Sequence, residues 1–367
     1  MLGRMAGILY NRSTRASKRF DEDKRSMATS IKDIAKKLNV SVSTVSYALN
    51  GGPRRVSTEV RDRVIEAAKD LGYRPNRVAK SMVTGKSRTI GVVPPEIGED
   101  VLLSPYLQLA LNGVFNAAGK ANQDLMLFTR LAESHHDEIV TTILDGRIDG
   151  AIFIAPSRTN HGVLVAKEMH IPCVTISNSQ IEGVITMSVA NRTGMNLVLN
   201  YLVKLGHRRI AHIAGRLDMQ DAIERLKAYS DFVGDNRLPS DDGWVVKGQF
   251  HPDGGYRAMK ELLSHPSLPT AVTCANDDMA IGAIRACREL GFRVPEDISI
   301  TGFDMTTTSD LATPALTTVR QPIAEMGSAA VAAVLALLED KEVPVHTVFQ
   351  PTLVTRSSTC IPKKESK

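Results

Sequence analysis

Beyond Ser87, short apolar segments alternate with helical stretches along most of the chain. Apolar runs of roughly five residues separated by helices are typical of parallel sheets, because parallel strands need long crossovers and are covered by helices on both faces. The pattern covers about 270 residues, which is more than one such sheet needs. It therefore predicts two similar α/β lobes, with ligands bound in the crevice at the carboxyl ends of their strands.

The individual elements follow from the same rhythm. The expected strands are Thr89–Val93, Asp124–Phe128, Ala151–Ala155, Cys173–Ser177, Ile210–Ala214, Val245–Phe250, Ala271–Ala275 and Ile298–Phe303. The expected helices include Leu107–Ala121, Asn191–Leu205, Ala222–Val233, Tyr256–Leu263 and Met279–Leu290.

Composition excludes several classes of protein. Hydrophobic residues make up 43% of the chain, enough to bury a core, and no apolar run approaches the roughly 20 residues that span a bilayer. The first 25 residues carry seven basic residues and no apolar centre, so they do not form a secretory signal. The four cysteines (Cys173, Cys274, Cys287 and Cys360) are dispersed singly, which favours a reducing cytoplasm.

Charge is distributed unevenly. Residues 1–85 contain 18 Lys and Arg against 8 Asp and Glu, whereas the rest of the chain contains 27 against 32. A basic amino-terminal segment on an acidic body favours binding to a polyanion, with nucleic acid the first candidate. A merely solvated basic tail remains the alternative.

Three short helices are expected after Thr29. Helical spacing begins with Ile34 and Leu38, and a second helix runs from Val42 to Leu49 with Ser41 as its N-cap. A third helix follows Ser57 and stops at Gly72. Two helices joined by a three-residue turn fit a helix-turn-helix, although a small helical bundle has the same pattern.

The second helix separates its residues by chemistry. Val45, Ala48 and Leu49 are expected to face inward. The other face carries a polar stripe at positions i, i+3, i+4 and i+7, formed by Ser43, Ser46, Tyr47 and Asn50. Such a helix has small hydroxyls for phosphates and longer side chains for base edges.

These motifs closely resemble the lactose/galactose-repressor family of bacterial transcription regulators. The head sequence TSIKDIAKKLNVSVSTVSYALN and the body motifs LGHRRIAHIAG, NDDMAIGAIRACRELGFRVPEDISITGFD and PALTTVRQP occur in the family's order. The resemblance covers residues 29–358. It implies an all-α helix-turn-helix head followed by a two-lobed body like a periplasmic binding protein, with parallel sheets.

The resemblance also implies domain boundaries. They are a disordered or untranslated extension at 1–28, a DNA-binding head at 29–75, a hinge helix and linker at 76–86, an effector-binding and dimerisation body at 87–358, and a tail at 359–367. We expect translation from Met27, or a dispensable extension, because MATSIKDIA is a typical family beginning.

DNA contacts are implied residue by residue. In the head the expected contacts are Val42, Ser43, Thr44, Ser46, Tyr47 and Asn50, with Val42, Ser43 and Tyr47 at the base-reading positions of the family. In the hinge helix, which enters the minor groove, they are Asn76, Arg77, Ala79 and Met82. Most members have Leu where this chain has Met82; methionine is apolar and can still unstack a base step, or it is a linker residue without DNA contact.

The expected effector site lies between the lobes. Its candidate residues are Tyr106, Arg225, Phe250, Asn276, Asp277 and Asp304. Asn276 and Asp277 follow a strand directly, where a carboxylate can accept two sugar hydroxyls. The resemblance implies that the planar guanidinium of Arg225 hydrogen-bonds two ligand oxygens and that the Phe250 ring stacks on the ligand.

Each candidate has a structural alternative. Asp277 could be a helix N-cap, and Arg225 a surface partner of Asp221 or Glu224. Phe250 and Tyr106 could belong to the core. The chain also departs from the family, which commonly has a carboxylate at Ser177 and another before Asn191, where this chain has Ala190.

The sequence therefore predicts an effector-controlled repressor that binds a palindromic operator as a homodimer in the cytoplasm, at the nucleoid. One short head makes too few base contacts, so two heads related by a two-fold axis are expected. A dimer is favoured over a tetramer, because the end of the chain lacks the leucine-repeat tail of tetrameric members. The effector is a sugar, with a purine or other corepressor as the alternative; no cofactor, metal or membrane is implied.

Two other classes fit poorly. A solute-binding protein needs an export signal and no DNA-binding head. An enzyme is not supported, because TGKS at 84–87 has Lys80 where a phosphate loop requires glycine, and no GxSxG or HExxH motif occurs. The adjacent His135 and His136 fit a solvated helix start better than a metal site.

Overall fold

The computed structural model describes residues 29–50, 55–74, 81, 85–95, 101–128, 142, 145–177 and 181–363. They form two compact units that divide between Ser87 and Arg88, here called the head and the body. The predicted extension at 1–28 lies outside the described residues, as do the hinge positions Asn76, Arg77, Ala79 and Met82.

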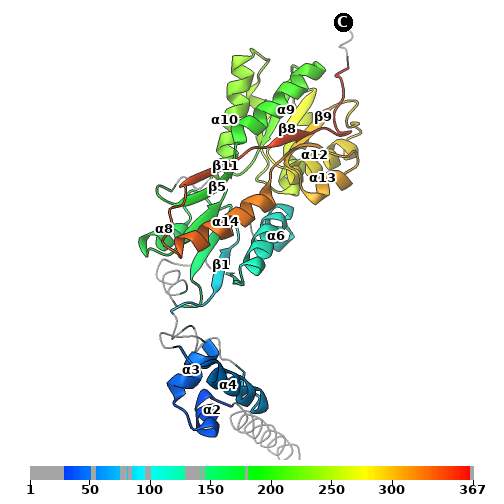
Figure 1. Cartoon of the computed structure of the whole chain (residues 1–367). Helices are drawn as coiled ribbons and strands as arrows, with labels where there is room; N and C mark the ends of the chain where they lie inside the picture. Colours follow the sequence, from blue (N-terminus) through cyan, green and yellow to red (C-terminus); the bar gives the residue numbers. More distant parts are fainter. Residues whose placement is uncertain are drawn as a thin grey trace, which may run out of the picture. The chain divides into compact units, whose positions relative to one another are not determined.

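The head contains three short helices, shown in blue in Figure 1: α2 (Ile31–Leu38), α3 (Val42–Asn50) and α4 (Thr58–Asp70). Each begins at a serine. The Ser30 and Asp33 side chains form a capping box, Ser41 Oγ accepts the Thr44 N–H at 3.0 Å, and Ser57 Oγ accepts the Val60 N–H. The small apolar core between the helices includes Ile34, Ala35, Val45, Ala48, Val64, Ala67 and Ala68.

The first lobe of the body is built on the six-stranded sheet β11-β5-β4-β3-β1-β2, in which all neighbouring strands pair in parallel. Its strands are β1 (Thr89–Val93), β2 (Asp124–Leu127), β3 (Gly150–Ile154), β4 (Cys173–Ile176), β5 (Ile185–Val189) and β11 (His346–Phe349). Its helices are α6 (Pro105–Lys120), α8 (His161–Glu168) and α14 (Ile323–Leu337), with a 3-10 turn at Val101–Leu103.

The second lobe is built on the sheet β12-β10-β9-β8-β6-β7, parallel except for β12, which runs antiparallel to β10. Its strands are β6 (Ile210–Ala214), β7 (Val245–Lys247), β8 (Ala271–Cys274), β9 (Ser299–Asp304), β10 (Thr317–Arg320) and β12 (Thr352–Val354). Its helices are α9 (Asn191–Leu205), α10 (Gln220–Asp235), α11 (Pro252–Leu263), α12 (Asp277–Glu289) and α13 (Thr307–Leu311), with a 3-10 turn at Asp242–Trp244. The predicted two-lobed α/β architecture is therefore confirmed.

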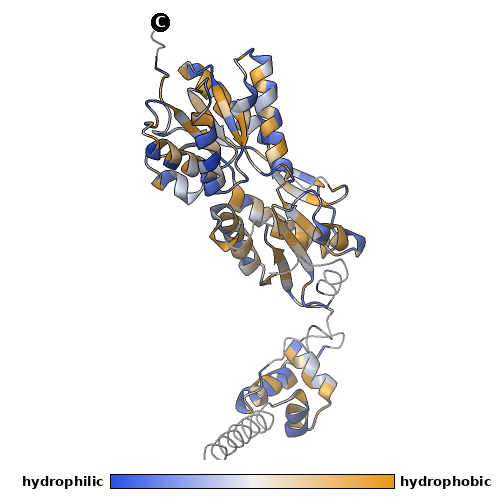
Figure 2. Cartoon of the chain, turned by 180° about the vertical axis from the view of Figure 1, so that it is seen from behind, coloured by the Kyte–Doolittle hydropathy of each residue, from blue (hydrophilic) through white to orange (hydrophobic). Residues whose placement is uncertain are grey.

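The chain passes from one sheet to the other through short connections. After β5 it enters α9, after β10 it returns through α14, and after β11 it enters β12. Figure 2 shows the strands of both sheets mainly in hydrophobic colours, as expected for strands covered by helices on both faces.

Two helices of the first lobe that are far apart in the sequence, α6 and α14, pack closely on each other. They lie side by side in Figure 1. A Cβ added at Gly113 would lie 2.0 Å from the carbonyl oxygen of Ala324, so only glycine permits this approach. The Ser328 hydroxyl donates to the Gly113 carbonyl oxygen at 3.2 Å.

Several elements were not predicted from the sequence, namely β5, β10, β11, β12, α8, α13 and α14. Strand β5 (ITMSV) mixes polar and apolar residues, so it shows no clear apolar period, yet all five residues are buried inside the sheet, where α14 packs on the strand. The expected strand Val245–Phe250 is shorter than predicted. It ends at Lys247 because Gln249 and Phe250 have φ of 62° and 60°, which no strand accommodates.

Candidate functional site

A cleft lined by residues of both lobes opens between them. It is formed where strands of both sheets end, since Ala155, Ser177 and Asn276 closely follow β3, β4 and β8 and Asp304 ends β9. The lining residues are Pro95, Ser104, Tyr106, Ala155, Ser177, Met219, Asp221, Arg225, Phe250, Asn276, Asp278 and Asp304. This is the position at which parallel α/β folds bind small ligands.

Four lining residues have a left-handed backbone that non-glycine residues seldom adopt. The φ angles are 44° at Ala155, 80° at Ser177, 60° at Phe250 and 124° at Asp304. Such conformations cost on the order of 1–3 kcal/mol each and concentrate at functional sites. The strand ends are thus bent so that these residues face the cleft.

Arg225, on α10, is held on several sides. Its Nε donates to Asn191 Oδ1 at 2.8 Å, and its Nη1 donates to the Ala275 carbonyl oxygen at 2.6 Å and lies 3.6 Å from Asp304 Oδ1. The guanidinium carbon lies 3.8 Å from the centre of the Phe303 ring. Only 3% of Arg225 is exposed, so the surface-partner alternative is wrong.

Asp221, which the sequence analysis did not propose as a ligand contact, joins the two lobes. Its carboxylate accepts hydrogen bonds from the Ser177 hydroxyl of the first lobe and from Asn191 Nδ2 at 2.9 Å. The chain lacks the carboxylates common in the family at Ser177 and at Ala190, the residue before Asn191. A carboxylate from α10 therefore lies against the position where a first-lobe carboxylate is absent.

Asp277 is not a lining residue, and the prediction that its carboxylate faces the ligand is corrected. It is fully buried, accepts the Thr306 N–H at 2.7 Å and the Thr318 hydroxyl, and packs against Gly302, where a Cβ would lie 2.2 Å from Oδ1. The N-cap alternative is also wrong, because Asn276 Oδ1 caps α12 by accepting the Met279 N–H at 2.9 Å. The hydrogen bonds of Asp277 thus connect α12 to β10 and to the turn after β9. The next residue, Asp278, lines the cleft.

Two aromatic residues line the cleft, one from each lobe. The Phe250 ring packs so closely on Gly215 that a Cβ there would lie 2.2 Å from it. Tyr106 comes from the first lobe, one residue after the start of α6, and its buried hydroxyl makes no hydrogen bond of ordinary geometry with a described residue, although the nearby Ser177 side chain opposes the rise of its pKa. Because a buried hydroxyl is normally satisfied, Tyr106 is available to a polar ligand atom.

Burial governs the ionisation of the cleft. It raises the pKa of Asp278 to about 6, although nearby His251 opposes the shift. It raises the pKa of Asp304 well above the ordinary value, against the attraction of Arg225, and that of Asp277 to about 7, against hydrogen bonds from Thr318 and Thr306. It also raises the pKa of Tyr106, and the negative charges of Asp221 and Asp304 add to that shift.

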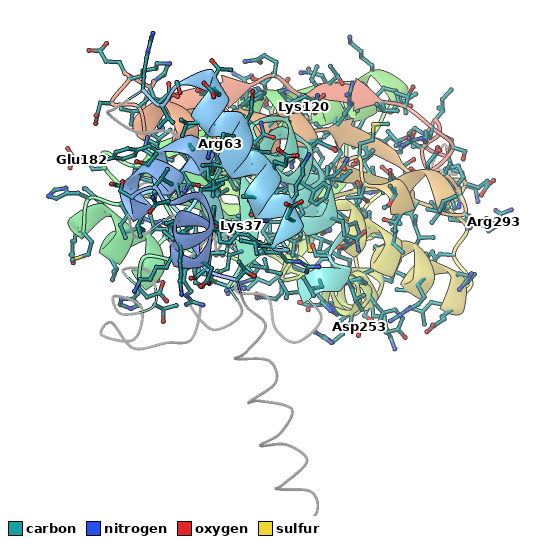
Figure 3. All side chains as sticks on the ribbon, turned by 60° about the horizontal axis from the view of Figure 1, so that its bottom comes forward. Lys37, Arg63, Lys120, Glu182, Asp253 and Arg293 are labelled. Carbon is teal, nitrogen blue, oxygen red and sulfur yellow. The ribbon has the colours of Figure 1, made fainter. Side chains whose placement is uncertain are left out.

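The head presents a separate candidate surface. The α3 residues expected to read DNA (Val42, Ser43, Thr44, Ser46, Tyr47 and Asn50) are exposed or half-buried, whereas Val45 and Ala48 are buried and Leu49 packs on the head core. Basic side chains surround the helices, among them exposed Lys37 on α2 and Arg63 on α4, which are labelled in Figure 3. This arrangement suits phosphate contacts around a helix that reads base edges.

Neither a metal site nor a membrane segment was found in the part of the chain that the structure describes. No three of its His, Cys, Asp and Glu side chains are grouped so that they could hold a metal ion. None of its helices is long and apolar enough to cross a bilayer.

Comparison with known proteins identifies the family. The model for bacterial regulatory proteins of the lacI family matches residues 30–76, and that for the periplasmic binding protein-like domain matches residues 199–359. The probable HTH-type transcriptional repressor ExuR of Bacillus subtilis is 33% identical over 325 residues, 88% of this chain and 95% of that protein. This chain belongs to the LacI family.

Other LacI-family proteins agree over nearly the whole length. The HTH-type transcriptional repressor PurR of Escherichia coli O139:H28 is 32% identical over 337 residues, 90% of this chain and 97% of that protein. The structure of the Lac repressor dimer bound to operator and the anti-inducer ONPF has a TM-score of 0.80 and 27% identity over 91% of this chain and 99% of that one. The complex of the transcriptional regulator CelR with cellobiose has a TM-score of 0.69 and 29% identity over 90% and 99%.

As a LacI-family member, the protein is a DNA-binding transcriptional repressor with an effector-binding body, and it is not an enzyme. Within the LacI-family cleft, the structure brings together five of the six predicted effector residues: Tyr106, Arg225, Phe250, Asn276 and Asp304. Asp221 and Asp278 also line the cleft and were not predicted from the sequence as site residues. Both stand within two residues of a helix start that follows a strand, and that position was the available signal.

Proposed function

We propose that this repressor binds a palindromic operator as a homodimer and that a sugar in the cleft sets its affinity for the operator. The supporting observation is the chemistry of the lining. Phe250 and Tyr106 suit the apolar face of a sugar ring, while Arg225, Asp278 and Asp304 suit its hydroxyls. The solved CelR complex contains cellobiose, which favours the same ligand class.

A purine is the second candidate, because the Phe250 ring would stack equally well on a flat base. A thermal-shift screen of sugars, sugar phosphates and purines separates the two, since a cleft ligand raises the melting temperature in proportion to the logarithm of its concentration over Kd. Stabilisation by purine bases and by no sugar would favour the second candidate.

The dimer follows from the small size of the reading surface. One nine-residue α3 helix reaches only a few base pairs, and a two-fold axis doubles the contacts on a palindrome. The relative solved on operator is a Lac repressor dimer. Hinge contacts by Asn76, Arg77, Ala79 and Met82 in the minor groove belong to the same proposal.

Operator binding is tested by electrophoretic mobility shift with DNA upstream of the gene itself. Tyr47→Ala is expected to weaken binding by roughly 1–3 kcal/mol and to relax the preference at one symmetric base pair. Lys120→Ala, an exposed change on α6 of the body, is the matched control and should leave binding unchanged. Equal losses for Tyr47→Ala on operator and on random DNA would exclude Tyr47 from base reading.

A further inference from the structure

One carboxylate in the cleft is left without a partner. Asp278 is the second residue of α12 and lines the cleft, and its side chain forms no hydrogen bond or ion pair with any other described residue. The other two carboxylates are occupied. Asp221 accepts hydrogen bonds from Ser177 and Asn191, and Asp304 accepts one from Gln321 Nε2 at 2.5 Å.

The positive charge of the cleft is already balanced. Among the described residues that line the cleft, Arg225 is the single cation, and its Nη1 lies 3.6 Å from Asp304. The described lining sets three carboxylates against this one guanidinium. Even if Asp304 holds a proton, since burial raises its pKa, Asp221 and Asp278 still outnumber Arg225.

An anionic ligand would therefore meet a lining whose described charges repel it, and the one guanidinium of that described lining is already paired with Asp304. A ligand with hydroxyl or ammonium hydrogens would instead meet an acceptor at Asp278 of the second lobe and the buried hydroxyl of Tyr106 from the first lobe. Of the charged groups near Asp278, Asp277 and Asp304 have the same sign, and His251, the N-cap of α11, has the opposite sign when protonated.

We propose that Asp278 makes the cleft select uncharged or cationic polyols and reject effectors that carry a phosphate or a carboxylate. Asp278 accepts a hydrogen from the ligand and repels anions. The inference rests on the proposed function of the cleft as an effector site and adds the charge class of the effector.

The experiment compares matched ligands on the full chain. Each hexose is paired with its anionic forms, the 6-phosphate and the uronic acid, and with its cationic amino sugar. Each purine base is paired with its anionic nucleoside monophosphate. Thermal shift first identifies the pairs in which either member binds. Titration calorimetry is expected to give at least tenfold weaker binding for the anionic member. A pair in which the anion binds as tightly as its neutral partner overturns the inference.

Variants then assign the effect to Asp278. Asp278→Asn keeps the shape and removes the charge, so it should reduce the ratio of neutral to anionic affinity about tenfold; Asp278→Ser serves if the first variant folds poorly. Asp253→Asn, an exposed change on α11 outside the cleft, is the matched control and should keep the wild-type ratio. An unchanged ratio in both Asp278 variants overturns the inference.

The results distinguish a failure of the proposed sugar effector from a failure of the charge selection by Asp278. If purine bases bind and no sugar does, the sugar proposal is wrong, and the charge preference is decided on the pairs of bases and monophosphates. If sugars bind but their anionic forms bind best, the effector site stands and the role of Asp278 is wrong.

Discussion

The two lobes contribute different chemistry to one cleft. The first lobe supplies Pro95, Ser104, Tyr106, Ala155 and Ser177, none of which carries a charge in its ordinary state. Among the described lining residues, the second supplies every charged group, namely Asp221, Arg225, Asp278 and Asp304. Because Arg225 lies 3.6 Å from Asp304 and donates hydrogen bonds to Asn191 and Ala275, the second lobe forms a preorganised charged wall, whereas the described wall of the first lobe is neutral. Changes in the second lobe should therefore cost the most.

The largest effect is expected from Arg225→Ala. It leaves Asp304, only 4% exposed, without its partner, and breaking such a buried pair costs about 3–5 kcal/mol in the free energy of unfolding. Urea denaturation measures the loss, and operator titration should show no effector response. The double variant Arg225→Ala/Asp304→Asn should recover part of the stability, and a loss below about 1 kcal/mol in the single variant would contradict the preorganised charged wall.

Asp277→Ala is expected to cost about 2 kcal/mol of stability, because the Thr306 N–H and the Thr318 hydroxyl lose a buried acceptor. The effector response should persist in the folded protein, since Asp277 does not line the cleft. Thermal unfolding and operator titration with effector measure the two quantities. Unchanged stability together with a lost response would return Asp277 to the ligand site.

Acid should destabilise the second lobe through His212 on β6. Burial lowers its pKa from 6.5 to about 3, so below pH 6.5 the unfolded chain takes up a proton that the folded chain does not. Stability is therefore lost as the pH falls from 6.5 toward 3, and the loss at pH 5 is about 2 kcal/mol. His212→Asn should remove this part of the change between pH 7.5 and 5, measured by urea denaturation. Parallel pH profiles for the two proteins would exclude His212.

The smallest effect is expected from the first lobe. Tyr106→Phe removes a buried hydroxyl without a protein partner, so the ligand-free protein should be as stable as the wild type. Effector affinity should fall by about 1 kcal/mol, because the ligand loses one hydrogen bond. Calorimetry measures this loss, and a Tyr106 effect as large as that of Arg225→Ala would break the contrast between the lobes.

Much of the fold was predictable, because local periodicity carries it. Apolar residues repeat at helical spacing in the three head helices, and they form continuous runs in the buried strands β1, β6 and β8. The cap at Ser41 was predictable as well, because serine directly before such a helix is a common N-cap. Strands β11 and β12 were not predictable in this way. They are short, partly exposed edge strands whose pairing with β5 and β10 is decided by residues far away in the sequence.

The sequence by itself determined the family, the two-lobed architecture and the residue types of the cleft, since these follow from motifs and from the position of side chains at strand ends. Tertiary structure alone decided which side chain lines the cleft. Asp277 and Asp278 are adjacent carboxylates, and no local pattern distinguishes them. The close approach of Gly302 and the Thr306 and Thr318 hydrogen bonds draw the first into the protein, which leaves the second in the cleft. Those contacts come from β9, β10 and the turn between them, and only folding brings them to the start of α12.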